Sequence, residues 1–246
     1  MIDLHRHPPT TLRRVRHRHG WLLAAVAALF GILALGAMLH ALRWDPAITD
    51  AAIDARTGTR DDVALAISRL GSTPIVLAVA ALAAGVAWPR CRPLAVAIVV
   101  LALARPLVEF GLKELIDRDR PQGDRLVRGR GPSFPSGHPF ATAASWGFLP
   151  LVVALYTRRR IVWWLVAVGA WTLVVLVAAS RVWLGVHWAS DALAGVLLAV
   201  LGVAVAEEVI ARFHGGGCRT PQPEGPDAAE TVTERSSPPA ARRTTS

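Results

Sequence analysis

The sequence predicts an all-α polytopic membrane protein: a bundle of six transmembrane helices with an interfacial helix and a disordered C-terminal tail. Hydrophobic residues make up 53% of the 246 residues, and the mean hydropathy is +0.40. This is too apolar for an ordinary soluble domain. The apolar residues come in runs of about 20, the length that crosses the hydrocarbon of a bilayer. Basic residues cluster just outside these runs, where Lys and Arg set membrane orientation.

The basic composition does not indicate a nucleic-acid partner. The formal net charge is +9 and the isoelectric point is about 11.3, values that would suggest nucleic-acid binding in a soluble protein. The sequence has no basic stripe interleaved with aromatic residues, the pattern typical of single-strand binding. The charge is therefore interpreted as a feature of membrane topology.

The chain divides into a basic N-terminal segment (1–20), a membrane domain (21–211) and a polar tail (212–246). The tail is rich in Gly, Pro, Ser, Thr and charged residues, which predicts disorder. The first apolar run is too long for the core of a signal peptide and lacks a clean cleavage site, which favours a retained helix. The six predicted transmembrane helices cover residues 21–42, 72–88, 94–112, 139–156, 161–179 and 192–210.

Residues 43–71 connect the first two runs and alternate acidic with spaced apolar side chains. This spacing predicts a short amphipathic helix at the membrane interface. If six helices alternate, both termini and the Arg-rich turns at 89–93 and 158–160 lie on one side, which the positive charge predicts to be the cytoplasm. The polar stretches 113–138 and 180–191 then share the outer face of a cytoplasmic (inner or plasma) membrane.

The chain has two cysteines, Cys91 and Cys218. Both fall on the predicted cytoplasmic side, where thiols are kept reduced. The sequence therefore predicts two free thiols.

Three cations from different segments are predicted to meet on the outer face: Lys113, Arg120 and Arg181. Lys113 is the only lysine in the chain. Each of them alone would suit a residue that extends from a helix end toward water. Like charges gather favourably only around an anion, and Arg binds phosphate in a bidentate manner. Together they predict a phosphate site.

The string Pro135-Ser136-Gly137-His138 precedes the fourth apolar run. Gly137 allows a ligand to approach the backbone closely, and the start of a helix offers free N–H groups to an anion. Pro139 suits the first position of that helix, where no N–H is needed. The string alone also fits a simple turn that ends in a histidine.

The third cluster runs from Ser180-Arg181 through Gly185 to His187 and Asp191. His187 and Asp191 are four residues apart and share one face of a helix. A carboxylate there can accept the imidazole N–H, fix the tautomer and stabilise the cation that forms as the ring attacks. A histidine bound to a helix-capping aspartate is the alternative. A metal held by His138, His187 and Asp191 is disfavoured by the three flanking cations.

These three clusters resemble the signature of the type 2 phosphatidic acid phosphatase (PAP2) superfamily, in its membrane lipid phosphate phosphatase branch. The signature reads Lys-x6-Arg-Pro, Pro-Ser-Gly-His and Ser-Arg-x3-Gly-x-His-x3-Asp, and the likeness covers residues 21–211 in the family's order. Two local features differ from many members: Pro139 follows the histidine, and Gln122-Gly123 replaces a second basic-proline pair. Both concern substrate fit.

The resemblance implies a phosphatase that needs no metal or cofactor and removes a terminal phosphate from a lipid phosphate or diphosphate. It implies that His187 forms a phosphohistidine, that Asp191 orients it and that His138 protonates the leaving group. It also implies a set of phosphate ligands, namely Lys113, Arg120, Arg181 and the backbone at Ser136 and Gly137.

The substrate class and the acceptor remain open at this point. Polyprenyl diphosphate, phosphatidic acid, phosphatidylglycerol phosphate and diacylglycerol diphosphate all fit, with a weak preference for the first. A lipid phosphotransferase would use the same phosphohistidine. A non-catalytic transporter or scaffold would be expected to have lost His187, Asp191 or His138, and a vanadate-binding haloperoxidase would be soluble.

The third run also carries Arg105 and Glu109, spaced i and i+4, with Lys113 at i+8. Charges at that depth usually face the interior of a bundle and pair there. We expect Glu109 to pair with Arg105 and to help position Lys113.

Overall fold

The computed structural model describes residues 10–213 and Cys218, and all the helices and strands assigned in this part of the chain are α-helices. The fold class is therefore all-α, as predicted. The helices are α1 (Thr10–Met38), α2 (Trp44–Asp54), α3 (Gly58–Arg69), α4 (Thr73–Ala87), α5 (Arg92–Ile116), α6 (Gly137–Trp146), α7 (Leu149–Ala154), α8 (Arg160–Trp183) and α9 (Ala189–Phe213).

Four of these helices are long and apolar enough to cross a membrane: Gly20–Met38 within α1, all of α5 and α8, and Ala189–Glu208 within α9. A fifth span results if α3 and α4, which meet at a bend of 44°, are taken together. The protein is thus an integral membrane protein, but the predicted count of six spans is not confirmed.

The predicted span at 139–156 is interrupted. The chain there forms α6 and α7, and the break lies at Gly147 and Phe148. Pro150 stands at the start of α7 and has no N–H to donate to the carbonyl of Trp146, so a continuous helix would lose a hydrogen bond and meet the proline ring. A hydropathy run cannot reveal such a break.

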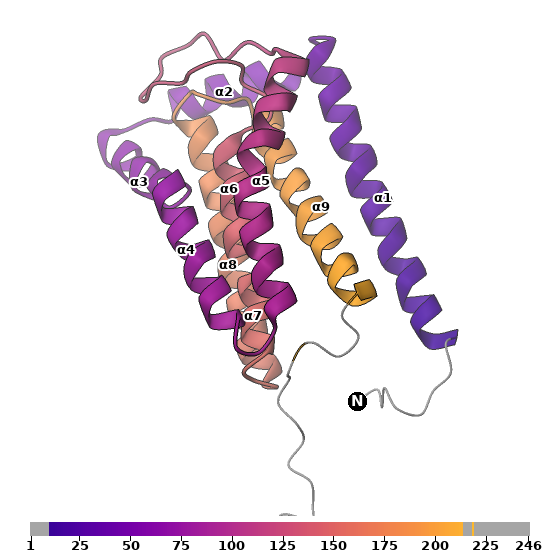
Figure 1. Cartoon of the computed structure of the whole chain (residues 1–246). Helices are drawn as coiled ribbons and strands as arrows, with labels where there is room; N and C mark the ends of the chain where they lie inside the picture. The colour runs from indigo at the N-terminus through magenta and orange to yellow at the C-terminus, as the bar shows by residue number, and fades with distance from the viewer. Residues whose placement is uncertain (1–9, 214–217, 219–246) are drawn as a thin grey trace, which may run out of the picture.

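The segment predicted as one interfacial helix forms two. In Figure 1, α2 lies across one end of the bundle, while α3 leads through a short break into α4. Gly71, in that break, packs closely on Thr142 of α6 and Val177 of α8, where a Cβ would come within 2.7 Å of each side chain. The absence of a side chain at Gly71 lets the α3–α4 bend approach the bundle.

The bundle core lies between α4, α5, α6, α8 and α9, and α1 packs along α9. Leu33 and Ala37 of α1 form an apolar cluster with Ala194 and Leu197 of α9. The start of α1 and the end of α9 lie at the same end of the molecule, opposite α2 and the 117–136 loop (Figure 1). Residues 1–9 of the predicted basic segment lie outside the described part, and its remainder belongs to α1, which begins at Thr10. Most of the predicted tail also lies outside the described part, and α9 ends at Phe213.

The prediction of free thiols is wrong in this structure. Cys91, in the turn between α4 and α5, forms a disulfide with Cys218, 127 residues later, and their Cα atoms are 4.2 Å apart. The two residues meet because α4 and α9 both end at the same end of the bundle.

Candidate active site

The residues predicted to carry chemistry converge at the end of the bundle that is covered by α2 and the 117–136 loop. Each cluster comes from a different place in the fold. Lys113 lies in the last turn of α5, Arg120 in the loop, Ser136, Gly137 and His138 at the start of α6, Arg181 in the last turn of α8, His187 in the α8–α9 connection and Asp191 in the first turn of α9.

His187 is buried, with 3% of its surface exposed, and both ring nitrogens have a neighbour. Its Nδ1 lies 2.8 Å from the carbonyl oxygen of Ser133, and its Nε2 lies 3.2 Å from the guanidinium of Arg120. A carbonyl can only accept and a guanidinium can only donate. The ring is therefore neutral, with its hydrogen on Nδ1 and a lone pair on Nε2.

Burial favours the same neutral form. It lowers the pKa of His187 to about 4, and the cations Arg120 and Arg181 act in the same direction, against the upward pull of Asp191. Nε2 therefore carries its lone pair at neutral pH, which is the state a nucleophilic imidazole requires.

Asp191 lies beside His187 but does not hold its N–H here. Oδ2 of Asp191 is 3.6 Å from Nδ1, beyond hydrogen-bonding distance, and accepts instead from the backbone N–H of Trp188 at 3.0 Å. The other carboxylate oxygen accepts from Arg118 at 2.7 Å. The predicted pairing brings the two side chains together, whereas the carbonyl of Ser133 fixes the tautomer.

Arg120 joins the 117–136 loop to the α8–α9 connection. Its guanidinium donates to the carbonyls of Val186 at 2.7 Å, Gly131 at 2.9 Å and Arg130 at 2.9 Å, in addition to its contact with His187. Burial, the largest influence, lowers its pKa. The guanidinium is held by neutral carbonyls, so its positive charge remains available to an anion next to Nε2.

Lys113 closes a ladder of charges along α5. Glu109 accepts from Arg105 at 2.7 Å and lies 3.6 Å from the Lys113 ammonium, which also donates to the carbonyl of Pro132 at 3.0 Å. The expected Glu109–Arg105 pair is confirmed. A Cβ at Gly137 would overlap the Glu109 carboxylate, so a larger residue there would displace the Glu109 side chain from its place between Arg105 and Lys113.

The ladder borders a cavity of about 350 Å³ between α4, α5 and α6. Lys113, Gly137 and His138 line it on one side, and Phe110, 64% exposed on the surface of α5, lines it on another. The cavity thus lies between charged groups and the apolar outer surface of a membrane-spanning helix.

Two buried polar atoms near this cavity have no partner within the described part of the chain. Arg181 donates to the hydroxyl of Ser68 at 2.6 Å, but its Nε is unpaired, and the hydroxyl of Ser136 is also unpaired. Ser136 is tied to α9 through its backbone N–H, which donates to the carbonyl of Asp191 at 3.0 Å. Buried donors without partners are costly, and an anion in the cavity would satisfy them.

Some contacts of the site could not be predicted from the motifs. The carbonyl of Ser133 carries no signal in the sequence, because every residue has one. Arg118 and Asp45 contact Asp191 or its neighbour from 73 and 145 residues away. Arg118 stands two positions before Arg120 in a charged stretch, which is a weak signal, and Asp45 has none.

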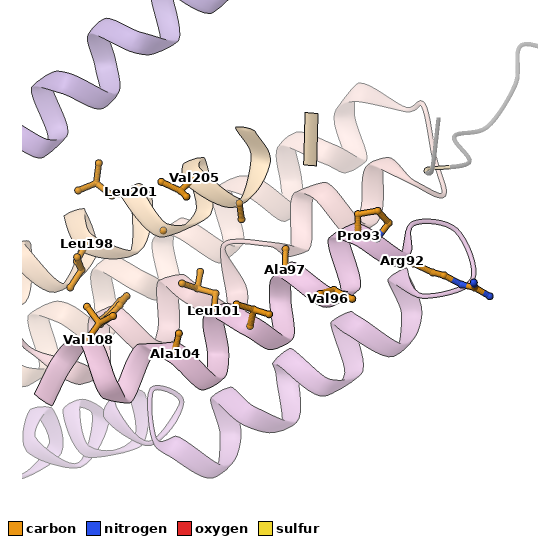
Figure 2. Close-up of a pocket in the computed structure, with 14 residues that line it drawn as sticks. Arg92, Pro93, Val96, Ala97, Leu101, Ala104, Val108, Leu198, Leu201 and Val205 are labelled. Carbon is orange, nitrogen blue, oxygen red and sulfur yellow. The ribbon is translucent and has the colours of Figure 1, made fainter. Parts of the chain in front are cut away.

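A larger apolar groove of about 790 Å³ lies between α5 and α9 (Figure 2). It is on a neighbouring face of α5, since Ala104 and Val108 line the groove while Arg105 and Glu109 line the cavity. Its far end is marked by Arg92. The groove is therefore distinct from the cavity between α4, α5 and α6, whose lining includes Lys113 and His138 but not His187.

Comparisons with known proteins identify the family. Residues 93–212 match the sequence profile of the PAP2 superfamily. Phosphatidylglycerophosphatase B of Bacillus subtilis (strain 168) is 31% identical over 163 residues, which cover 64% of this chain and 78% of that protein. The resemblance noted in the sequence is confirmed.

Two solved structures share the fold. The crystal structure of a transmembrane PAP2 type phosphatidylglycerolphosphate phosphatase from Bacillus subtilis superposes with a TM-score of 0.73 at 25% identity, over 79% of this chain and 98% of that chain. The structure of LpxE from Aquifex aeolicus matches with a TM-score of 0.54 at 17% identity, over 68% of this chain and 96% of that chain.

Proposed function

The chain belongs to the PAP2 superfamily, and on this premise we propose that it is a metal-independent lipid phosphatase that works through a phosphohistidine on His187. The observation that carries the proposal is the neutral His187 ring, whose Nε2 lone pair meets the guanidinium of Arg120 at 3.2 Å. A phosphoryl group at that point would contact nucleophile and cation together. Phosphoryl transfer depends mainly on such positioning and charge stabilisation.

The proposed reaction has two steps. Nε2 of His187 forms a bond to phosphorus as the bond from phosphorus to the lipid oxygen breaks, and His138 gives that oxygen a proton. Burial and the cations around His138 lower its pKa to about 3 in the free enzyme. The proposal therefore requires that His138 takes up this proton as the anionic phosphate binds, because the anion offsets the cations. Water then attacks the phosphohistidine and passes a proton back to His138, which releases phosphate and restores the neutral ring. Asp191, 3.6 Å from Nδ1, balances the positive charge that the ring acquires.

The phosphate oxygens would be held by the ring of cations and by free donors at the start of α6. The unpaired Nε of Arg181 and hydroxyl of Ser136 support this assignment, together with Lys113 and Arg120. The backbone at Gly137, the first residue of α6, adds N–H groups directed at an anion. Within residues 10–213 and Cys218, no group of three or more His, Cys, Asp or Glu side chains is arranged to hold a metal.

The substrate is proposed to be a lipid whose tail stays in the bilayer. The cavity reaches the exposed Phe110 on a membrane-spanning helix, so a headgroup can enter while its chains remain in hydrocarbon. The curated relative and one similar structure, both from Bacillus subtilis, carry the name of a phosphatidylglycerol phosphate phosphatase, which favours a phosphomonoester of that kind over polyprenyl diphosphate or phosphatidic acid.

We also infer that the site opens on the outer face of the cytoplasmic membrane, with both termini in the cytoplasm. The inference rests on the Arg-rich turns near Arg90, Arg92 and residues 158–160, which lie at the end opposite the site.

The test is phosphate release by the purified protein in mixed micelles from phosphatidylglycerol phosphate, phosphatidic acid and a polyprenyl diphosphate, with and without a chelator. Wild type should act on at least one and be unaffected by the chelator. His187→Ala should lower kcat by roughly 10³-fold or more, since it removes the nucleophile. An acid-labile, base-stable phosphoenzyme should form only in wild type. Activity that persists in His187→Ala, or that is lost with chelator, contradicts the proposal, and phosphate transfer to an added lipid alcohol would identify a phosphotransferase instead.

A further inference from the structure

We propose that Asp45 and Arg118 are positioning residues that hold Asp191 in place and so control the reactivity of His187. This rests on the proposed role of His187 as nucleophile. The two residues come from the first turn of α2 and from the loop after α5, and neither lines the cavity between α4, α5 and α6. The region 43–71 thereby gains a role beyond covering the end of the bundle.

The contacts form one continuous chain of charged hydrogen bonds. One guanidinium nitrogen of Arg118 donates to Asp191 at 2.7 Å, and the other donates to Asp45 at 2.8 Å. All three side chains are buried, with 0% exposed surface for Asp45 and Asp191 and 7% for Arg118. Such buried, charge-assisted pairs fix geometry tightly.

Ser190 ties the network to the start of α9. Its backbone N–H donates to Asp45 at 2.9 Å, and its hydroxyl also donates to Asp45 while accepting from Arg118 at 2.7 Å. A carboxylate at this position satisfies a free N–H of the helix and suits the positive end of its dipole. Asp45 therefore fixes the first turn of α9, on which Asp191 stands.

Arg118 is confined in two further ways. Its guanidinium lies over the ring of Trp188, 5.5 Å from the ring centre, and it has carboxylates on two sides. With one cation between two carboxylates, the unit carries one net negative charge beside His187. That charge stabilises the ring more strongly when the imidazole becomes positive during attack on phosphorus, which is a preference for the transition state over the resting enzyme.

A positioning role for Arg118 and Asp45 predicts a change in kcat with little change in KM. Since Arg118 and Asp45 do not contact the cavity, their loss should leave substrate binding nearly intact and slow the chemical step. A residue that only supports folding would instead reduce the amount of folded protein, with normal kinetics in what remains.

The experiment compares Arg118→Gln, Arg118→Lys, Asp45→Asn and the double variant Asp45→Asn/Arg118→Gln with wild type. We expect Arg118→Gln to lower kcat and the rate of phosphohistidine formation by roughly 10² with KM changed less than about threefold, because misplacement of a supporting group costs that much. Arg118→Lys should recover part of the loss. The loss in the double variant should be smaller than the product of the two single losses, since Asp45 acts in part through Arg118.

A matched control is Asp61→Asn. Asp61, in α3, also accepts a partly buried hydrogen bond from another helix, donated by the indole N–H of Trp183 in α8 at 2.8 Å. Asp61 has no contact with Asp191. Its kcat should stay within about twofold of wild type, as for a surface substitution away from the site. Folded fraction is measured for every variant by detergent size-exclusion profile and thermal melting.

Three results would overturn the inference: a rise in KM with unchanged kcat, multiplicative losses in the double variant, or a loss of activity fully accounted for by loss of folded protein. If Arg118→Gln does not fold, the milder Asp45→Asn carries the same kinetic test. Should His187→Ala stay active, the proposed function fails. If His187→Ala is inactive while Arg118→Gln is normal, only the positioning role fails.

Discussion

At the residue level, the chemistry of the site follows from which neighbours can donate and which can accept. Ser133 offers a carbonyl to Nδ1 of His187, and Arg120 offers an N–H to Nε2. The tautomer of His187 is therefore set by Ser133 and Arg120, and Asp191 accepts a hydrogen bond from Arg118 instead. The carboxylate can then respond to charge on the ring rather than to its resting hydrogen.

The buried, neutral His187 predicts a low acid limit for activity. Its pKa is lowered to about 4, mainly by burial. The protonated ring has no lone pair to attack with, so the part of the kcat/KM profile that belongs to His187 should fall to half near pH 4. The measurement is a pH–rate profile on a soluble short-chain lipid phosphate in detergent.

Substrate ionisation needs a control, because a phosphomonoester loses its second proton near pH 6. The profile is repeated with a substrate whose second phosphate pKa differs by about one unit. A step that moves with the substrate belongs to the substrate. A fixed acid limb near pH 6.5 on both substrates would show that His187 is not held neutral as described.

The residues of the three motifs were predictable because their spacing carries their geometry. His187 and Asp191 lie 3.6 Å apart because they are close in the sequence, although His187 is in the connection before α9 and not on a shared helical face as predicted. Arg118 and Asp45 were not, because their partners lie 73 residues or more away and contact depends on how α2 folds over the bundle. A single sequence contains no measure of that distance.

At the level of elements, α5 spaces three charged side chains at intervals of one helical turn. Arg105, Glu109 and Lys113 fall on successive turns, so the helix alone brings Glu109 within 2.7 Å of Arg105 and 3.6 Å of Lys113. The ammonium of Lys113 is held between Glu109 and the carbonyl of Pro132. Glu109 is proposed to position Lys113 toward the cavity.

This arrangement predicts the effect of Glu109→Gln. The amide keeps the shape of the side chain but removes its negative charge. Arg105 and Lys113 are then left near each other without an anion between them, and the Lys113 ammonium is free to move. We expect KM to rise roughly tenfold, about 1.4 kcal/mol of lost substrate binding, with a smaller change in kcat. Steady-state kinetics on the preferred lipid phosphate measures both.

Glu114→Gln is the matched control, because Glu114 is on the same helix one position after Lys113 but is exposed. It should leave KM within about twofold of wild type. If Glu109→Gln behaves like Glu114→Gln in both KM and melting temperature, Glu109 does not position Lys113.

Hydropathy predicted the long helices well and the interrupted ones poorly. The runs at 161–179 and 192–210 became α8 and α9, extended by a few residues at each end. The run at 139–156 is broken because Pro150 cannot complete the helical ladder. The apolar composition of a run indicates that it lies in lipid or in a protein core, whereas the continuity of its helix depends on single backbone N–H groups, such as the one that Pro150 lacks.

At the level of the whole molecule, two features of the end opposite the site point to different compartments. The basic turns near Arg90 and residues 158–160 are typical of a cytoplasmic face. The disulfide between Cys91 and Cys218 is at the same end, and disulfides are rare in a reducing cytosol. The charge pattern involves several residues on two turns and decides our proposed orientation.

Site-directed labelling discriminates the two orientations. Asp124→Cys places a thiol at the site end, where Asp124 has a side chain 77% exposed, and Arg158→Cys places one in an exposed turn at the other end. In sealed spheroplasts, a membrane-impermeant maleimide should label the variant at 124 and should label the one at 158 only after lysis. Wild type, treated identically, reports any labelling of the native cysteines. Labelling at 158 but not at 124 in sealed cells would place the catalytic cavity on the cytoplasmic face and the disulfide in the oxidising compartment, and the proposed orientation would be reversed while the chemistry of His187 stayed unchanged.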